Sequence, residues 1–377
     1  MAKSSFAPNP VKIKVIGLGG GGCNAVTRMV RQDIRGVEFV AMNTDAQALA
    51  VTEAPFRVQL GDKIVRGLGV GGDHVQGQKA AEESRDQIRE LVAGADMVFI
   101  TAGMGGGTGT GAAPVVADIA QQTGALTIAV VTRPFGFEGT RRAQVANEGI
   151  TRLLDKVVDT LIIIPNDRLL ELCDHKTGVD EAFRMADDVL SHGVQAIAQV
   201  ITVPGMINLD FADVKAVMKD AGPAWMSIGK GSGQHRAADA AKEALASPLL
   251  DVSVAGSRGV LFNVVGGDDL ALFEVNEAAE IIKGAVDPDA NIIFGVVHEP
   301  AMEKEIRITL IATGFTADTE TTKGSRDDEI TEFLKEWKSE DQLDIPAFLR
   351  RPLYNQRRTS VPQPTITGSR GTESTYH

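Results

Sequence analysis

Cysteine and aromatic residues are scarce in this chain. Its two cysteines, Cys23 and Cys173, are too few for a disulfide framework or a four-thiolate metal site. Aromatic residues make up 5% of the sequence, which argues against a stacking platform for single-stranded nucleic acid. No apolar run approaches the ~18 residues of a membrane span, and residues 1–10 lack the apolar stretch of a signal peptide. These absences predict a cytoplasmic protein with no direct membrane insertion.

Positive charge is also in short supply. The 377 residues carry 50 Asp and Glu against 38 Lys and Arg, a formal net charge of −12. An acidic surface repels phosphate backbones and anionic lipid, so we expect no nucleic-acid partner. The apolar fraction of 43% is ordinary for a globular chain, and the length is sufficient for two domains.

The order of apolar patterns predicts an α/β fold in several parts. Over residues 11–177, short apolar runs alternate with helix patterns, which indicates a parallel sheet covered on both faces. Apolar residues then recur at spacings of three and four, which predicts a long central helix over 178–204. Residues 205–315 alternate strand and helix patterns again, so we expect a smaller α+β domain. We expect residues 1–10 to be flexible.

Residues 316–377 differ in composition from the rest of the chain. They are polar and acidic and hold too few apolar residues to fold alone, so we expect a flexible linker and tail.

Two glycine clusters each lie between a predicted strand and a predicted helix. In the first, "GLGGGGCNAV", the residues Gly17, Gly19 and Gly22 fit the pattern G-x-G-x-x-G, and Asp45 ends the next strand at about the expected distance. This pattern alone is typical of a dinucleotide-binding unit, so an NAD-dependent oxidoreductase is one interpretation.

The second cluster, "TAGMGGGTGTGAAP", begins at Thr101. Its glycines allow backbone N–H groups to converge on an anion at a helix N-terminus. Thr108 and Thr110 supply hydroxyls that we expect to meet phosphate oxygens. Two such loops in one sheet predict a polyphosphate held from two sides. The chain has no G-x-x-x-x-G-K-[ST] sequence, so we do not expect a P-loop enzyme.

Several motifs, in order, resemble those of one family. The "GGGTGTG" at Gly105–Gly111 is similar to the tubulin signature, and "NTDAQAL", "TRPFGFEG", "IIPNDRLL" and "GMINLDFADVKA" extend the likeness to the FtsZ family of cell-division proteins over residues 11 to 315. The resemblance implies a Rossmann-like GTPase domain, GTP or GDP as ligand, and Mg²⁺. It also implies a head-to-tail homopolymer, located at the mid-cell division ring, that recruits other division proteins.

The same resemblance assigns a nucleotide-binding site. Phosphate contacts are expected from the two glycine loops: Gly20, Gly21, Gly22, Cys23, Asn24, Gly107, Thr108 and Gly109. Ribose and phosphate contacts are expected from Glu138 and Arg142, and guanine contacts from Asn166, Phe183 and Asp187.

The chemistry of guanine supports these assignments. A carboxylate at Asp187 can accept hydrogen bonds from the ring N–H and the exocyclic amine of guanine, which adenine does not offer in that arrangement. Phe183 lies one helical turn earlier and could flank the base, although its place in an apolar stripe fits core packing equally well. Cys23 departs from the small polar residue or glycine common in the family, which predicts a thiol-sensitive site.

Asn208, Asp210 and Asp213 are candidate catalytic residues within a loop over 205–213. Taken alone, Asp210 fits a helix N-cap and Asp213 a first helical turn. A carboxylate can also orient or deprotonate an attacking water. The helix between Asp187 and residue 203 would carry the chain roughly 24 Å away at ~1.5 Å per residue. If these acids are catalytic, they act on the nucleotide of a neighbouring subunit, and a repeated open contact of this kind is a filament.

The segment "DIPAFLRR" resembles the family's C-terminal partner-binding peptide. The residues expected to bind are Asp344, Ile345, Pro346, Phe348, Leu349 and Arg350. A short apolar peptide with basic flanks suits a groove on a partner, here membrane-tethering and regulatory division proteins. Incidental hydrophobic residues in a disordered tail are the alternative, and a tubulin-like GTP-binding regulator that does not polymerise is the alternative for the whole chain.

Overall fold

The computed structural model describes residues 11–155, 157–171, 173, 176–202, 209–249, 254 and 256–315. These residues belong to one compact unit. The predicted catalytic Asn208, the N-terminal ten residues, and the tail with its peptide at 344–350 lie outside the described residues. The predictions made for them, and the domain boundaries within the compact unit, therefore stay predictions.

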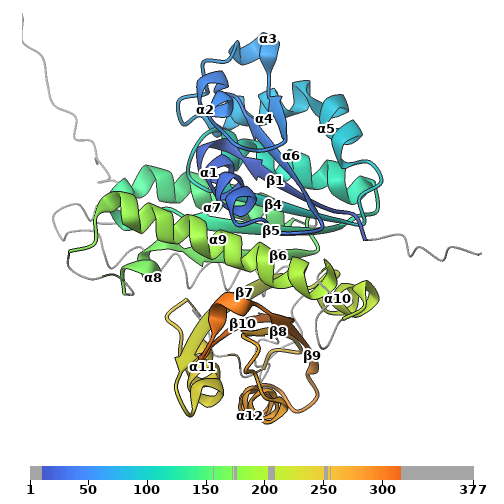
Figure 1. Ribbon diagram of the computed structural model, residues 1–377. Coiled ribbons are helices and arrows are strands. Elements are labelled where there is room, and N and C mark those ends of the chain that lie inside the picture. The colour runs from blue at the N-terminus through green and yellow to red at the C-terminus, as the bar shows by residue number, and fades with distance from the viewer. Residues whose placement is uncertain are drawn as a thin grey trace, which may run out of the picture. The chain divides into compact units, whose positions relative to one another are not determined.

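One ten-stranded sheet runs through the molecule in the order β3-β2-β1-β4-β5-β6-β7-β10-β8-β9 (Figure 1). The first six of these strands are parallel to one another, in the order typical of a Rossmann fold. Their bounds are β1 Ile13–Leu18, β2 Val37–Asn43, β3 Phe56–Gln59, β4 Met97–Gly103, β5 Leu126–Arg133 and β6 Thr160–Pro165. The central strands are buried almost throughout, which confirms the predicted parallel sheet.

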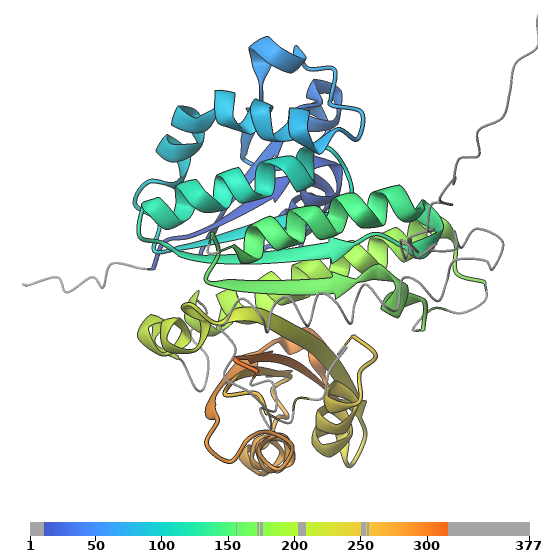
Figure 2. The same cartoon turned by 180° about the vertical axis from the view of Figure 1, so that it is seen from behind.

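Helices cover both faces of this parallel part. The helices α1 and α9 pack on one face, and α4, α5, α6 and α7 pack on the other (Figures 1 and 2). Their bounds are α1 Gly19–Arg31, α4 His74–Glu83, α5 Arg85–Val92, α6 Thr108–Gln122, α7 Thr140–Leu154 and α9 Val179–Thr202. The shorter helices are α2 Ala46–Ala50, α3 Asp62–Val65, η1 Gly136–Glu138, α8 Asn166–Leu170, α10 Phe211–Met218 and η2 Pro300–Met302.

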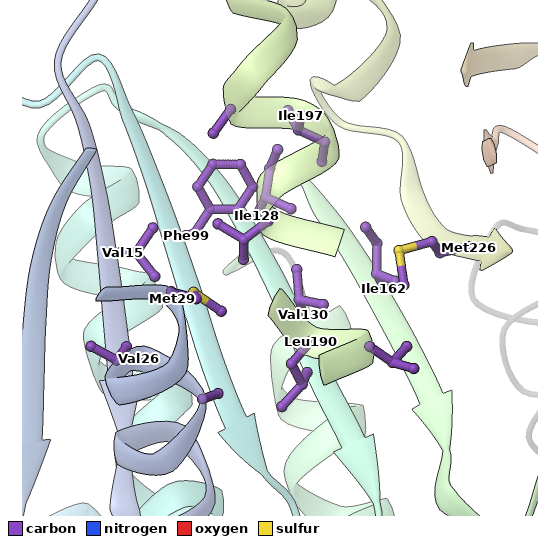
Figure 3. Packing of buried hydrophobic residues seen from close by; sticks show 14 of the residues in the cluster. Val15, Val26, Met29, Phe99, Ile128, Val130, Ile162, Leu190, Ile197 and Met226 are labelled. Atoms are coloured by element: carbon purple, nitrogen blue, oxygen red, sulfur yellow. The ribbon is translucent and has the colours of Figure 1, made fainter. Parts of the chain in front are cut away.

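The long helix α9 contributes to the main core. Its residues Leu190 and Ile197 pack against side chains of β4 and β5, including Phe99 and Ile128 (Figure 3). Burial of this apolar stripe against the sheet is what stabilises the helix, because a single helix gains little from its own hydrogen bonds. The buried stripe does not extend into the first turn of α9, where Val179 is 64% exposed.

The C-terminal part continues the same sheet with mixed strand directions. Strand β10 is antiparallel to both β7 and β8, and β7 pairs with β6 over three residue pairs. The bounds are β7 Gly222–Ser232, β8 Gly259–Gly266, β9 Asn291–His298 and β10 Glu305–Thr313, with helices α11 Arg236–Leu245 and α12 Leu272–Lys283. These elements enclose a second apolar cluster of their own, as expected for a smaller α+β part.

None of the helices among the described residues combines the length and the apolar character that a bilayer crossing requires.

Candidate functional site

The two glycine clusters meet at the carboxyl ends of β1 and β4. A Cβ atom added to Gly19 would lie 2.8 Å from the backbone nitrogen of Gly109, and one added to Gly21 would lie 3.4 Å from that of Gly103. Glycine is therefore required for the loops to approach so closely. β1 and β4 are neighbours from which the sheet order proceeds in opposite directions, and open α/β sheets bind ligands at this switch point.

The backbone at this switch point is suited to an anion. Neither α1 nor α6 has a side-chain cap at its N-terminus, so their first N–H groups are available to a ligand. A Cβ on Gly20 or Gly106 would have no atom within 4 Å, so both glycines face open space. We call the N-terminal ends of α1 and α6, with Gly20 and Gly106, the phosphate site.

The two threonines of the second loop have different surroundings. The Thr108 hydroxyl lies 2.6 Å from that of Thr44, and Thr108 is 9% exposed. Thr110 is buried, and its hydroxyl oxygen accepts a hydrogen bond of 2.8 Å from the backbone N–H of Gly105. The Thr110 hydroxyl therefore helps to hold the loop in shape, and its contact with a phosphate stays a prediction.

Cys23 does not present its thiol to the phosphate site. The side chain is 2% exposed and packs in the main core, with Sγ 3.8 Å from the carbonyl oxygen of Met42. Burial raises the pKa of the thiol to about 11, so it stays protonated and unreactive at neutral pH. The predicted thiol sensitivity is wrong, and only the backbone of Cys23 can contact a ligand.

A cavity of about 420 Å³ lies between α1 and α9. Three of the predicted nucleotide-binding residues, Asn24, Phe183 and Asp187, line it. Phe183 is 40% exposed, so the alternative interpretation of Phe183 as a core residue is wrong. Its ring makes an edge contact with Phe135, with the centroids 5.3 Å apart.

The Asp187 carboxylate lines this cavity, and one of its two oxygens accepts a hydrogen bond from Arg28. Arg28, from α1, donates to Asp187 through Nε at 3.3 Å and to Asp188 through Nη1 at 3.0 Å. Burial raises the pKa of Asp187 to about 6, although the charge of Arg28 opposes this rise. The cavity therefore contains a hydrogen-bond acceptor that loses its charge in mildly acidic solution.

Asn166 holds an amide oxygen without a partner. The residue begins α8 directly after β6 and is 4% exposed, and its Oδ1 makes no hydrogen bond within the described part of the chain. The next residue, Asp167, accepts a 2.8 Å hydrogen bond from the backbone N–H of Gly136, beside the Phe135 ring that contacts Phe183. Asn166 is not among the residues that line the cavity, but a buried acceptor without a partner is a candidate ligand contact.

Glu138 and Arg142 contact each other. They form an ion pair, and Glu138 also accepts a 2.9 Å hydrogen bond from the backbone N–H of Phe135. The side chain of Glu138 is 10% exposed and that of Arg142 is 58% exposed. Glu138 thus fixes the turn after β5, while Arg142 remains accessible to an anion.

Sequence reasoning missed a third glycine-rich segment. Four glycines between Gly67 and Gly72 have positive φ angles, and the segment closes against the second cluster, where a Cβ on Gly107 would lie 2.5 Å from Val70. The density of glycine before α4 was a signal that could have found it. Arg28 was missed as well, and no local pattern indicates its contact with Asp187.

Asp45 serves a local purpose. Its carboxylate caps α2 by accepting hydrogen bonds from the N–H groups of Gln47 at 2.8 Å and Ala48 at 3.1 Å. In the dinucleotide interpretation this carboxylate would bind a ribose. Its use as a helix cap argues against an NAD-dependent oxidoreductase.

Asp210 and Asp213 are separated from the cavity by most of α9. Asp210 is the N-cap residue of α10 without a side-chain capping bond, and Asp213 lies in the first turn. Figure 1 shows α10 beside the C-terminal end of α9, whereas Asp187 lies near its beginning. The structure therefore does not bring these acids together with Asp187 in one chain.

Metal ligands are not gathered in the part of the chain that the structure describes. No group of three or more His, Cys, Asp or Glu side chains there could hold a metal ion.

Comparison with known protein families identifies the class to which this protein belongs. The model of the tubulin/FtsZ family GTPase domain matches residues 12–174, and the model of the FtsZ family C-terminal domain matches residues 222–316. The fold is thus that of a tubulin-like GTPase, a class that implies binding of GTP or GDP.

Solved structures narrow this class. An FtsZ dimer from M. jannaschii is 43% identical, with a TM-score of 0.79 over 84% of this chain and 95% of that chain. A point mutant of FtsZ from M. jannaschii is 45% identical, with a TM-score of 0.79 over 81% and 92%. This chain belongs to the FtsZ family. CetZ2 from Haloferax volcanii, in a GTPγS-bound protofilament, is 19% identical with a TM-score of 0.69 over 88% and 100%, and shares the fold.

Proposed function

We propose that this protein is a cytoskeletal GTPase whose subunits assemble head-to-tail, each subunit completing the active site of the next. The observation that carries the proposal is the position of Asp210 and Asp213 beyond the C-terminal end of α9, far from Asp187. From Asp187 to Thr202, α9 rises about 22 Å at ~1.5 Å per residue. The family membership, and the FtsZ dimer among its solved relatives, support self-association.

In this proposal, one subunit binds the nucleotide and the neighbouring subunit supplies the catalytic acids. The phosphate site binds the triphosphate through backbone N–H groups, and Mg²⁺ would neutralise phosphate charge while keeping water and phosphate oxygens as most of its ligands. Asn166, Phe183 and Asp187 select guanine. Asp210 and Asp213 of the neighbouring subunit orient the attacking water, with Asn208 as a further contact.

A dilution series tests the dependence on assembly. We expect GTP turnover per subunit to rise steeply above a critical protein concentration, together with light scattering and pelleting of polymer. Turnover that is constant per subunit across the series would contradict the proposal, and would favour a regulator that does not polymerise.

A mixing experiment tests the division between subunits. Asp213→Ala should bind GTP and assemble without turnover, whereas Asp187→Ala should bind GTP poorly. Mixing the two variants should restore turnover, because a contact between them joins an intact nucleotide site to an intact acid. Asp239→Ala is the matched control, since Asp239 is an exposed acid in the first turn of α11. A mixture as inactive as its components would refute catalysis between subunits.

The cellular part of the proposal concerns the tail. We propose that filaments form the division ring at mid-cell and that residues 344–350 bind membrane-tethering and regulatory proteins. A chain ending at residue 315 should assemble in solution yet fail to form a ring in dividing cells. Ring formation by that truncated chain would remove the tail from this function.

A further inference from the structure

Two buried hydroxyls meet beneath the phosphate site. Thr44 follows β2, and its Oγ1 lies 2.6 Å from Oγ1 of Thr108, the first residue of α6. Thr44 is 0% exposed, and Thr108 is 9% exposed. The geometry alone allows either hydroxyl to be the donor.

Burial decides the direction of this hydrogen bond. Within the described part of the chain, the Thr44 hydroxyl has no acceptor besides Thr108. If Thr108 were the donor, the Thr44 proton would be buried without an acceptor, which costs about 1–3 kcal/mol. Thr44 therefore donates to Thr108. The Thr108 proton is then free to point toward a ligand at the start of α6.

Backbone hydrogen bonds join residues 44–46 to the third glycine-rich segment, residues 67–72. The carbonyl oxygen of Thr44 accepts a hydrogen bond of 3.3 Å from the N–H of Gly69, and Ala46 donates its N–H to the carbonyl oxygen of Gly67 at 3.1 Å. Thr44 thus has a fixed backbone, which keeps its hydroxyl in one place below Thr108. Fixed placement of a hydroxyl is what a positioning role requires.

We propose that Thr44 is a positioning residue of the phosphate site, whose hydroxyl orients the Thr108 O–H group toward a phosphate oxygen of the bound nucleotide. The proposal rests on the nucleotide binding of the family and is independent of assembly. Thr44 acts only through Thr108, and the hydrogen bond that it prepares is one between a neutral donor and an anionic acceptor, the stronger kind.

Thr44→Val tests the role, because valine keeps the shape and removes the hydroxyl. We expect GTP and GDP to bind about tenfold more weakly to this variant, the loss of about 1.4 kcal/mol, in competition with a fluorescent nucleotide. Guanosine, which has no phosphate, should bind as it does to the wild type. Thr44→Ser restores the hydroxyl and should restore nucleotide affinity. Equal losses for guanosine and GTP would overturn the proposal.

A double-mutant cycle separates positioning from a general loss of stability. In the Thr108→Val background, Thr44→Val should change nucleotide affinity less than twofold, because its only route to the ligand is gone. The same tenfold loss in both backgrounds would overturn the proposal. Thr127→Val is the matched control, because Thr127 is a buried threonine near the amino-terminal end of β5, whereas the phosphate site lies at the carboxyl ends of β1 and β4. It should lower the melting temperature without changing nucleotide affinity. A wild-type chain that binds no GTP would overturn the nucleotide site and this role with it.

Discussion

Acidification should weaken guanine binding through a single carboxylate, Asp187. Burial raises its pKa to about 6 from the ordinary value of 3.8, and in the proposed site only the ionised form would accept both hydrogen bonds from guanine. In the free protein, about nine-tenths of Asp187 is ionised at pH 7 and about one-tenth at pH 5. Affinity should therefore fall about tenfold over this range. With the ordinary pKa, nearly all of the carboxylate would remain ionised and affinity would hardly change.

The same shift has the opposite effect on the stability of the empty protein. A carboxyl with a raised pKa in the folded state contributes most stability below its ordinary pKa, and that contribution is lost as pH rises through about 6. At neutral pH the ionised Asp187 costs up to about 3 kcal/mol of folding free energy. Protonation of Asp187 in acid thus stabilises the folded state of the empty protein while it weakens the binding of guanine.

Guanosine is the suitable ligand for this assay, since GTP and GDP carry phosphates that titrate in the same range. Arg28→Leu removes the charge that opposes the pKa rise, so the midpoint of the affinity profile should move to higher pH. Arg35→Leu removes the same charge from an exposed side chain that pairs with Asp33, and should leave the midpoint unchanged. Asp187→Asn should give a flat profile. A wild-type profile that is also flat from pH 5 to 7 would refute the reasoning.

Three further predictions concern stability and reactivity. Burial lowers the pKa of His192 to about 4, so the contribution of His192 to stability should fall by up to about 3 kcal/mol as pH drops from about 6.5 toward 4. Urea unfolding of the wild type and of His192→Gln should isolate this contribution from the opposite one of Asp187, and the same pH dependence in both proteins would contradict it. Arg236 is 5% exposed and pairs with Asp269 and Glu274, so Arg236→Ala should lower the free energy of unfolding in urea by about 1–3 kcal/mol, because the partly buried Glu274 loses a charged hydrogen-bond partner; a cost below about 1 kcal/mol would show that water replaces the guanidinium. Cys23 should resist alkylation in the native protein and react once urea unfolds it, as mass spectrometry of the modified peptide can show, and rapid native modification would contradict its burial.

The parts of the site that depend on chain order could be predicted from the sequence. A glycine cluster between a strand and a helix indicates a backbone-lined loop wherever it occurs, and the clusters around Gly20 and Gly107 do meet across neighbouring strands. The periodicity of residues 178–204 likewise indicated the long helix that the structure describes as α9, Val179–Thr202.

Side-chain direction within those loops could not be predicted in the same way. Cys23 and Thr110 lie in the predicted segments, yet one thiol packs into the core and one hydroxyl bonds to Gly105. Both outcomes depend on neighbours supplied by the folded loop. The contact of Arg28 with Asp187 joins residues 159 positions apart, and no local pattern encodes such a pair.

In the proposed head-to-tail assembly, half of an active site at each end of α9 would give the filament a direction. At one end the last subunit would present an open nucleotide pocket, and at the other end the last subunit would present Asp210 and Asp213 with nothing to act on. The nucleotide in the open pocket would lack a neighbour's acids, so it would be the one nucleotide in the filament that is spared from hydrolysis. The two ends would then differ in chemistry as well as in shape, and they should grow and shorten at different rates.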